Sequence, residues 1–387
     1  MSDEQKRRFD GRLRPPTPPK GRGAVSNPAN RYEPRRVVPL DDGWGGAGGG
    51  PEWAPGGEPG GAPEGGPGRV PTSVTPEASR TILSRNDSPD VPFDRSINPY
   101  KGCEHGCVYC FARPTHAYLG LSPGLDFETK IFSKPDAARL LEEELRRPSY
   151  CCEVIALGAN TNPYQPAECE LGITRRILET LDEHGHPVGV VTKSNLVLRD
   201  LDILVRMAER KLACVFLSIT TLDLDLARRM EPRAPTPQRR LEAIRILGES
   251  GVPVGVLAAP MIPGLNDAEL ERILEAAAGA GAQSAGYVLV RLPLEVKELF
   301  GEWLEAHYPL KKDHVLSLIR QTHGGRLYDP EFGARMRGTG PYADLLRQRF
   351  AKACRRLGLG PRLDALDTTQ FRVPPRKGDQ PSLFGDR

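Results

Sequence analysis

The chain has 387 residues, eight cysteines and a net charge of only +3. This length suits one large domain or two ordinary ones. No apolar run reaches the roughly 18 residues that a membrane-spanning helix needs, so we expect no such helix. No apolar segment follows the charged N-terminus, so we expect no signal peptide, and the cysteines then indicate a reducing cytoplasm.

Charge is distributed unevenly along the chain. Residues 1–36 and 311–387 carry an excess of Lys and Arg, whereas the segment between them is acidic. Basic ends on an acidic body favour a polyanionic partner such as nucleic acid. The alternative is that both ends are solvated tails.

Residues 1–74 are crowded with Pro and Gly and poor in apolar side chains, a composition that does not form a core. We therefore predict a disordered basic arm and linker over 1–74. The short basic stretch 20–28 has an alternative interpretation, in which it docks on the body or on a phosphate backbone.

Strands and helices are predicted to alternate over 75–310, after a first strand at 92–98 and a helix at 134–147 opened by Ser133 and Pro135. The next strands are predicted at 153–158, 187–192, 213–219, 253–259 and 285–290. Helices are predicted at 168–184, 199–210, 223–230, 236–250, 267–280, 295–306 and 312–321. The strands are short, continuous and rich in Val, Leu and Ile, as expected of a parallel sheet covered on both faces.

Six β/α units predict an α/β fold, a partial (β/α)6 barrel whose active site lies at the carboxyl ends of its strands. A helical basic extension is predicted over 311–365 and a flexible tail over 366–387.

Three cysteines, Cys103, Cys107 and Cys110, fall within eight residues in a C-x3-C-x2-C pattern. Runs of this density hold iron–sulfur clusters, and a four-iron cube with three cysteine ligands keeps one iron open for chemistry. A structural zinc site made by these cysteines with His105 or His116 is the alternative. A disulfide framework is less favoured, because the other cysteines are scattered.

The cysteine loop after the first strand of a six-unit barrel, with Tyr109 before the last cysteine, resembles the radical S-adenosylmethionine (SAM) superfamily over about 90–310. Within it, the stretches 158–168, 192–194, 218–222, 231–237, 260–267 and 287–293 are similar to the branch of spore photoproduct lyase and DNA repair photolyase-like proteins. The resemblance implies that the three cysteines hold a 4Fe–4S cluster whose fourth iron is chelated by SAM. It further implies reductive cleavage of SAM, hydrogen abstraction from a substrate, and an electron donor such as flavodoxin or ferredoxin.

Polar residues at the predicted strand ends are the candidates for SAM binding. Thr161 and Ser194 have an alternative role as helix caps, and Lys193 has one as a surface ion-pair partner. The full set of candidates is Tyr109, Asn160, Thr161, Asn162, Lys193, Ser194, Ser218 and Arg233.

One departure separates the chain from the lyase, which places a hydrogen-donating cysteine just after the second strand. Ala159 stands at or beside that position here, so the lyase's own reaction is not implied. Cys169, Tyr164 and Tyr287 are alternative hydrogen donors.

The tail peptide Gln380–Phe384 resembles the motif by which bacterial DNA-processing proteins engage the sliding clamp. With the basic ends, it favours a radical SAM enzyme that acts on DNA or RNA. The alternatives are a radical SAM enzyme that modifies a small molecule or a protein side chain, and a non-enzymatic metal-bound protein that binds nucleic acid.

Overall fold

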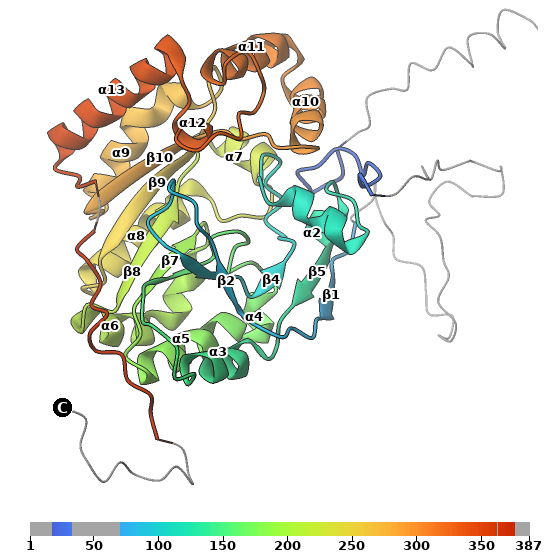
Figure 1. The fold of residues 1–387 in the computed structure, drawn as a ribbon. Helices are drawn as coiled ribbons and strands as arrows, with labels where there is room; N and C mark the ends of the chain where they lie inside the picture. The colour runs from blue at the N-terminus through green and yellow to red at the C-terminus, as the bar shows by residue number, and fades with distance from the viewer. Residues whose placement is uncertain (1–17, 33–69, 362, 376–387) are drawn as a thin grey trace, which may run out of the picture.

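A sheet with six parallel strands forms the centre of the computed structural model, which describes residues 18–32, 70–361 and 363–375 (Figure 1). The strand order is β10-β9-β8-β7-β6-β3-β2, and β2 at the edge runs antiparallel to β3. The strands are β2 (Leu83–Arg85), β3 (Arg95–Ile97), β6 (Ile155–Leu157), β7 (Val188–Thr192), β8 (Ala213–Ser218), β9 (Val254–Met261) and β10 (Ser284–Leu289). The predicted α/β fold with six β/α units is confirmed.

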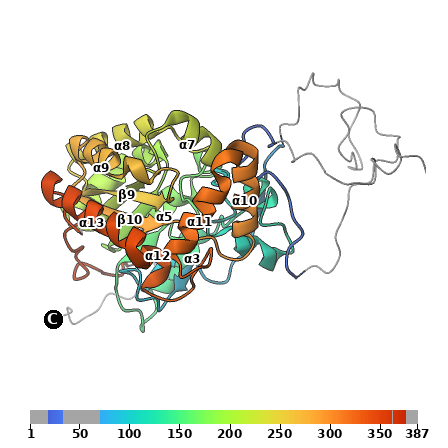
Figure 2. The same cartoon turned by 90° about the horizontal axis from the view of Figure 1, so that it is seen from above.

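Helices cover the outer face of this sheet (Figures 1 and 2). Their buried Leu, Ile and Ala side chains join the strand side chains in one large apolar core. The covering helices are α3 (Ala137–Leu145), α5 (Ile173–Glu183), α6 (Leu201–Glu209), α8 (Pro237–Glu249), α9 (Leu270–Gly279) and α13 (Gly340–Leu357). Because the strands are parallel, their carboxyl ends lie along one edge, where ligands bind in folds of this kind.

A second, three-stranded sheet was not predicted. It has the order β1-β5-β4, with β1 (Ser73–Pro76), β5 (Lys130–Ser133) and β4 (Tyr100–Lys101). These strands are too short to give a periodic sequence signal. The small sheet matters for function, because β4 leads directly into the cysteine loop.

Several other predictions need correction. The single helix predicted at 168–184 is divided into α4 (Glu168–Leu171) and α5, because Gly172 between them has φ +59°. The extension predicted as helical over 311–365 contains a loop between α11 (Lys312–Thr322) and α12 (Ala334–Arg337), which precedes α13. Helices α7 (Leu224–Met230), α10 (Val296–His307) and α11 lie where they were predicted.

Both ends of the chain include segments that pack on the body. Residues 18–32 bridge α2 (Asp126–Thr129) and α10, through Asn27 with Asp126 and Ser26 with Glu302 (blue in Figure 1). The prediction of disorder is therefore wrong for 18–32. Within 363–375, Phe371 packs against the rings of Tyr150 and His186. The clamp-like peptide 380–384 lies outside the described residues.

Candidate metal centre and cofactor site

The cysteine loop, residues 102–110, begins at the carboxyl end of β3 after the short strand β4. Gly102 and Gly106 have φ values of +78° and +67°, a left-handed conformation that suits glycine. A Cβ at Gly102 would also lie only 2.9 Å from the Phe127 carbonyl oxygen. The two glycines thus allow the backbone to turn tightly around the three cysteines.

Cys103 and Cys107 are buried, Cys110 is partly buried, and none of the three forms a disulfide. Cys103 and Cys110 pack around Phe127, and Cys107 joins Cys110 in the adjacent apolar cluster. Burial, with a contribution from Cys110, raises the pKa of Cys103 to about 12. Thiolates in such a place need a compensating cationic centre, and three free thiols on one loop fit an iron–sulfur cluster.

The zinc alternative requires His105 or His116 beside the three cysteines. Among the described residues, no group of three or more His, Cys, Asp or Glu side chains surrounds one ion position. His105 and His116, the proposed zinc partners, are both buried, and His116 Nε2 lies 3.0 Å from the Lys130 carbonyl oxygen.

A fully buried ion pair, Arg113 with Glu128, holds the cysteine loop in place. The Arg113 guanidinium donates to the carbonyl oxygens of Cys107 at 2.9 Å and Gly106 at 3.3 Å, and also to the Glu128 carboxylate. Because Arg113 belongs to the 3-10 helix that follows the loop (Arg113–Leu119), the loop is tied to its own continuation.

The N-terminal segment 18–32 completes this arrangement from outside. The backbone N–H groups of Gly23 and Ala24 donate to the two Glu128 carboxylate oxygens at 2.9 and 2.8 Å. A Cβ on Gly23 would lie 1.7 Å from the Gly106 carbonyl oxygen, so only glycine permits this approach. Val25 enters the apolar cluster that contains Cys107. The segment therefore covers the cysteine loop.

Residues 160–162 follow β6 and lie directly beside the cysteine loop. The backbone N–H groups of Asn160 and Thr161 donate to Asn98 Oδ1 at 2.9 and 3.3 Å, and the Thr161 hydroxyl donates to the Tyr100 carbonyl oxygen at 2.7 Å. A backbone hydrogen bond from Asn162 opposes the rise in the pKa of the Cys103 thiol. The Thr161 hydroxyl thus holds the 160–162 loop against β4.

Lys193, at the end of β7, belongs to a charged network that sequence reasoning did not identify. Its Nζ lies 3.6 Å from Glu231 Oε1 and 5.7 Å from the centre of the Tyr109 ring. Glu231 also pairs with buried Arg240 and accepts a hydrogen bond from the Tyr109 hydroxyl. Burial alone would raise the pKa of Glu231, but Arg240 and Lys193 lower it below its usual value. A fixed carboxylate therefore positions Lys193 beside the residue that precedes Cys110.

The three remaining candidates for SAM binding lie in different surroundings. Ser194 is the N-cap of the 3-10 helix Asn195–Asp200, because its Oγ accepts from the Leu196 N–H at 3.2 Å. Ser218 is buried at the end of β8. Arg233 pairs with Glu104 of the cysteine loop at 3.1 Å. The helix-cap interpretation is thus correct for Ser194, and Arg233 lies against the cysteine loop.

The alternative hydrogen donors lie in unfavourable places. Tyr164 is fully buried and its hydroxyl donates to Asp200 Oδ2 at 3.1 Å. Tyr287 packs against Phe350 of α13, on the outer side of the sheet. Cys169 is exposed on α4. None of the three is shown beside the cysteine loop.

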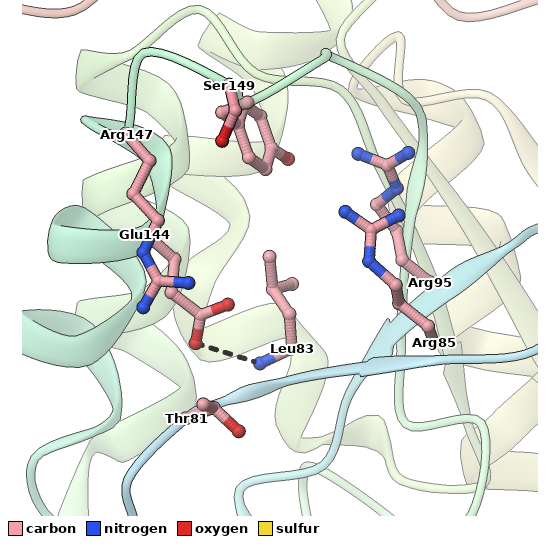
Figure 3. A pocket seen from close by; sticks show the side chains of 8 residues that line it. Thr81, Leu83, Arg85, Arg95, Glu144, Arg147 and Ser149 are labelled. Carbon is pink, nitrogen blue, oxygen red and sulfur yellow. Dashed lines mark hydrogen bonds between the residues drawn. The ribbon is translucent and has the colours of Figure 1, made fainter.

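Two cavities lie near these elements. One of about 380 Å³ adjoins the cysteine loop and is lined by Arg22, Val70, Pro71, Thr72, Glu104 and Arg233. Another of about 260 Å³ lies between β2 and α3 (Figure 3), where Glu144 accepts a hydrogen bond from the Leu83 N–H. The labelled side chains of Figure 3 include none of the candidate site residues, so this cavity is separate from the site. Among the described residues, no helix has the length and apolarity to cross a membrane.

Comparison with known proteins gives consistent matches. Residues 97–277 match the Radical SAM superfamily. An uncharacterized protein of Mycobacterium tuberculosis is 36% identical over 263 residues, which cover 67% of this chain and 74% of that protein. An uncharacterized protein of Methanocaldococcus jannaschii is 28% identical over 173 residues, covering 45% of this chain and 62% of that protein.

A solved structure of spore photoproduct lyase complexed with dinucleoside spore photoproduct is similar with a TM-score of 0.53 and 16% identity. The match covers 74% of this chain and 80% of the lyase chain. A lyase mutant with bound AdoMet and the same dinucleoside gives a TM-score of 0.52, also at 16% identity. At this level of identity, the likeness concerns the fold.

Proposed function

Because the chain belongs to the radical SAM superfamily, we propose that this enzyme cleaves SAM reductively and abstracts hydrogen from a nucleic acid. The superfamily uses a 4Fe–4S cluster and SAM, and these are the cofactors of this chain. When bound and reduced, the cluster supplies the electron that breaks SAM into methionine and a 5′-deoxyadenosyl radical, which takes hydrogen from the substrate. The protein's own residues bind, orient and shield these groups.

The observation that carries the proposal is the place of the cysteine loop. Cys103, Cys107 and Cys110 lie at the carboxyl edge of the parallel sheet, beside the 160–162 loop and Lys193. We assign the three cysteines to the cluster. Lys193 is the partner for the SAM carboxylate. Glu231, whose Oε1 lies 3.6 Å from Lys193 Nζ, positions the ammonium, and the ammonium can also donate to a second carboxylate.

The other candidates take supporting roles in this proposal. Asn160 and Asn162 offer amide groups to SAM, and Ser218 offers a hydroxyl from the end of β8. Thr161 and Ser194 act by fixing their loops, since both hydroxyls are already bonded to the backbone. Tyr109, held by Glu231, supports the last cysteine, and Arg233 holds Glu104 of the cysteine loop.

Anaerobic reconstitution tests the chemistry. We expect a brown protein with absorbance near about 400 nm that forms 5′-deoxyadenosine from SAM and dithionite. Cys107→Ser should abolish both signals, whereas Cys151→Ser, at an exposed thiol away from the loop, should keep them. A colourless protein that binds zinc in place of iron would overturn the proposal.

The nucleic-acid substrate is supported by the basic ends of the chain and by the fold shared with spore photoproduct lyase. A base would enter the carboxyl edge from a single strand or after flipping, as base-modifying enzymes require. A flavodoxin or ferredoxin is the proposed electron donor, and the peptide 380–384 the proposed contact with the sliding clamp. Oligonucleotides should stimulate 5′-deoxyadenosine formation. Stimulation by a small molecule or a peptide alone would shift the substrate class.

A further inference from the structure

Arg291 is a cation at the carboxyl end of β10 that has no carboxylate partner among the described residues. It is partly buried, and its guanidinium carbon lies 4.1 Å from the centre of the Phe111 ring, next to Cys110. Among the residues that the structure describes, it has neither a carboxylate within ion-pair distance nor a hydrogen-bond acceptor. Burial lowers its pKa, whereas Tyr328, Cys110 and Asp90 oppose this, and Asp90 is already paired with Arg335.

A guanidinium in this position requires an anion. Removing a charge from water is unfavourable unless a partner compensates it, and the planar donor fork of arginine matches phosphate oxygens in particular. Stacking on Phe111 fixes the plane of the fork. The described residues give this fork no hydrogen-bond acceptor, so its N–H groups are free to donate to a phosphate.

Two exposed aromatic side chains belong to this region, Phe111 under Arg291 and Phe332 under Arg335. Phe111 is 39% exposed and Phe332 is 56% exposed. Arg335 lies 4.5 Å over the Phe332 ring and influences Arg291 electrostatically, as does Tyr328. Phe111 directly follows the cysteine loop, Phe332 precedes α12 and Arg335 lies within α12, which contacts β10 (Figure 1).

We infer that Arg291, Phe111 and Phe332 form a binding platform for a phosphodiester and an unstacked base of single-stranded nucleic acid. Interleaved arginines and exposed aromatic rings are how proteins hold single strands, since each base offers a face for stacking. The inference rests on the proposed function, because it assigns the residues that receive the proposed substrate. The occupant is a single strand rather than a duplex, since a base must leave its stack to lie on a ring.

The test is binding of fluorescein-labelled dT12 and U12 to the full-length, cluster-loaded protein, followed by fluorescence anisotropy at several salt concentrations. Arg291→Gln should weaken binding about tenfold or more and reduce the slope of log affinity against log salt by about 0.7, the value for one phosphate contact in a single strand. Arg245→Gln is the matched control. It removes the same charge from α8, where Arg245 pairs with Glu242 and Glu249, and should change neither quantity.

Phe332→Ser gives a second measurement that does not depend on Arg291. Because Phe332 is exposed, its replacement should not disturb folding. It should weaken binding about tenfold while leaving the salt slope unchanged, because stacking releases no counterions. The dT12 and U12 arms show whether the platform prefers DNA or RNA. Equal loss for both supports recognition through phosphate and base stacking alone.

Several results would overturn the inference. The first is unchanged oligonucleotide binding in Arg291→Gln and Phe332→Ser. The second is that poly-glutamate binds the wild-type protein as tightly as the oligonucleotides do and loses the same affinity in these variants. The third is that the variants lose affinity for SAM but not for the oligonucleotides. SAM cleavage without oligonucleotide is measured on the same samples. If 5′-deoxyadenosine forms but single strands are not bound through Arg291, the platform is refuted and the SAM chemistry stands.

Discussion

Glu128→Gln should destabilise the protein strongly, because it removes a buried charge on which the cysteine loop and the N-terminal segment both depend. Glu128 and Arg113 are each fully buried in the folded chain. The carboxylate accepts from Arg113 and from the N–H groups of Gly23 and Ala24. Glutamine presents an NH2 group to one of these donors and leaves the Arg113 charge without a counter-ion.

The magnitude follows from these contacts. Removing one partner of a buried ion pair costs about 3–5 kcal/mol, and one lost hydrogen bond adds about 1 kcal/mol. At about 2–4 °C per kcal/mol in large domains, we expect the melting temperature to fall by about 8–24 °C. The 18–32 segment should also become more accessible to trypsin at Lys20, Arg22 and Arg31.

The assay compares thermal melting by circular dichroism and the rate of trypsin cleavage, before and after cluster loading. The matched control is Glu242→Gln, the same substitution in an exposed pair with Arg245, for which no change is expected. If Glu128→Gln and Glu242→Gln melt alike and are cleaved alike, the buried ion pair does not hold the loop and the segment together.

Three further predictions concern other parts of the molecule. Gly23→Ala should detach residues 18–32, because the new Cβ would meet the Gly106 carbonyl oxygen at 1.7 Å; trypsin cleavage reports it. Lys193→Met should raise the Kd for SAM about tenfold or more, with little loss of melting temperature. Ser194→Ala should instead lower the free energy of unfolding by about 1 kcal/mol, because the helix cap is lost, and should leave the affinity for SAM unchanged. Burial lowers the pKa of His186 to about 4. Below pH about 6.5 the unfolded chain therefore binds a proton that the folded chain does not, and the free energy of unfolding should fall by about 2 kcal/mol from pH 7 to 5. This fall should be smaller in His186→Gln.

Each of these predictions has a control and a contradicting outcome. Gly279→Ala, with no atom within 4 Å of the new Cβ, should leave trypsin cleavage unchanged, and equal cleavage of both variants would refute the contact. Equal SAM affinity in Lys193→Met and wild type would remove Lys193 from the SAM site. An identical decline with acid in His186→Gln would mean that other groups set the pH dependence.

The sequence predicted those features whose signal is local. The three cysteines lie within eight residues, and each parallel strand is a continuous apolar run, so the cysteine loop and the six β/α units were predictable. The cap role of Ser194 was foreseen as an alternative for the same reason, since it depends on a residue two positions away.

The missed features depend on contacts between distant residues. The N-terminal segment binds Glu128 through the backbone N–H groups of Gly23 and Ala24. Every residue except proline has such an N–H group, so the amino-acid composition does not indicate these contacts. Glu231 stood in a recognised stretch, but its pairing with Lys193 and Arg240 emerges only when β7, α7 and α8 come together. The SAM contacts themselves remain predictions.

The most direct test of the account is deuterium transfer. The cluster-loaded enzyme is given SAM, dithionite and an oligonucleotide deuterated in its sugars and bases, and the 5′-deoxyadenosine is analysed by mass spectrometry. Hydrogen abstraction from nucleic acid predicts 5′-deoxyadenosine that carries deuterium from the oligonucleotide. Unlabelled 5′-deoxyadenosine, formed in the presence of a labelled strand that the enzyme binds, would contradict it.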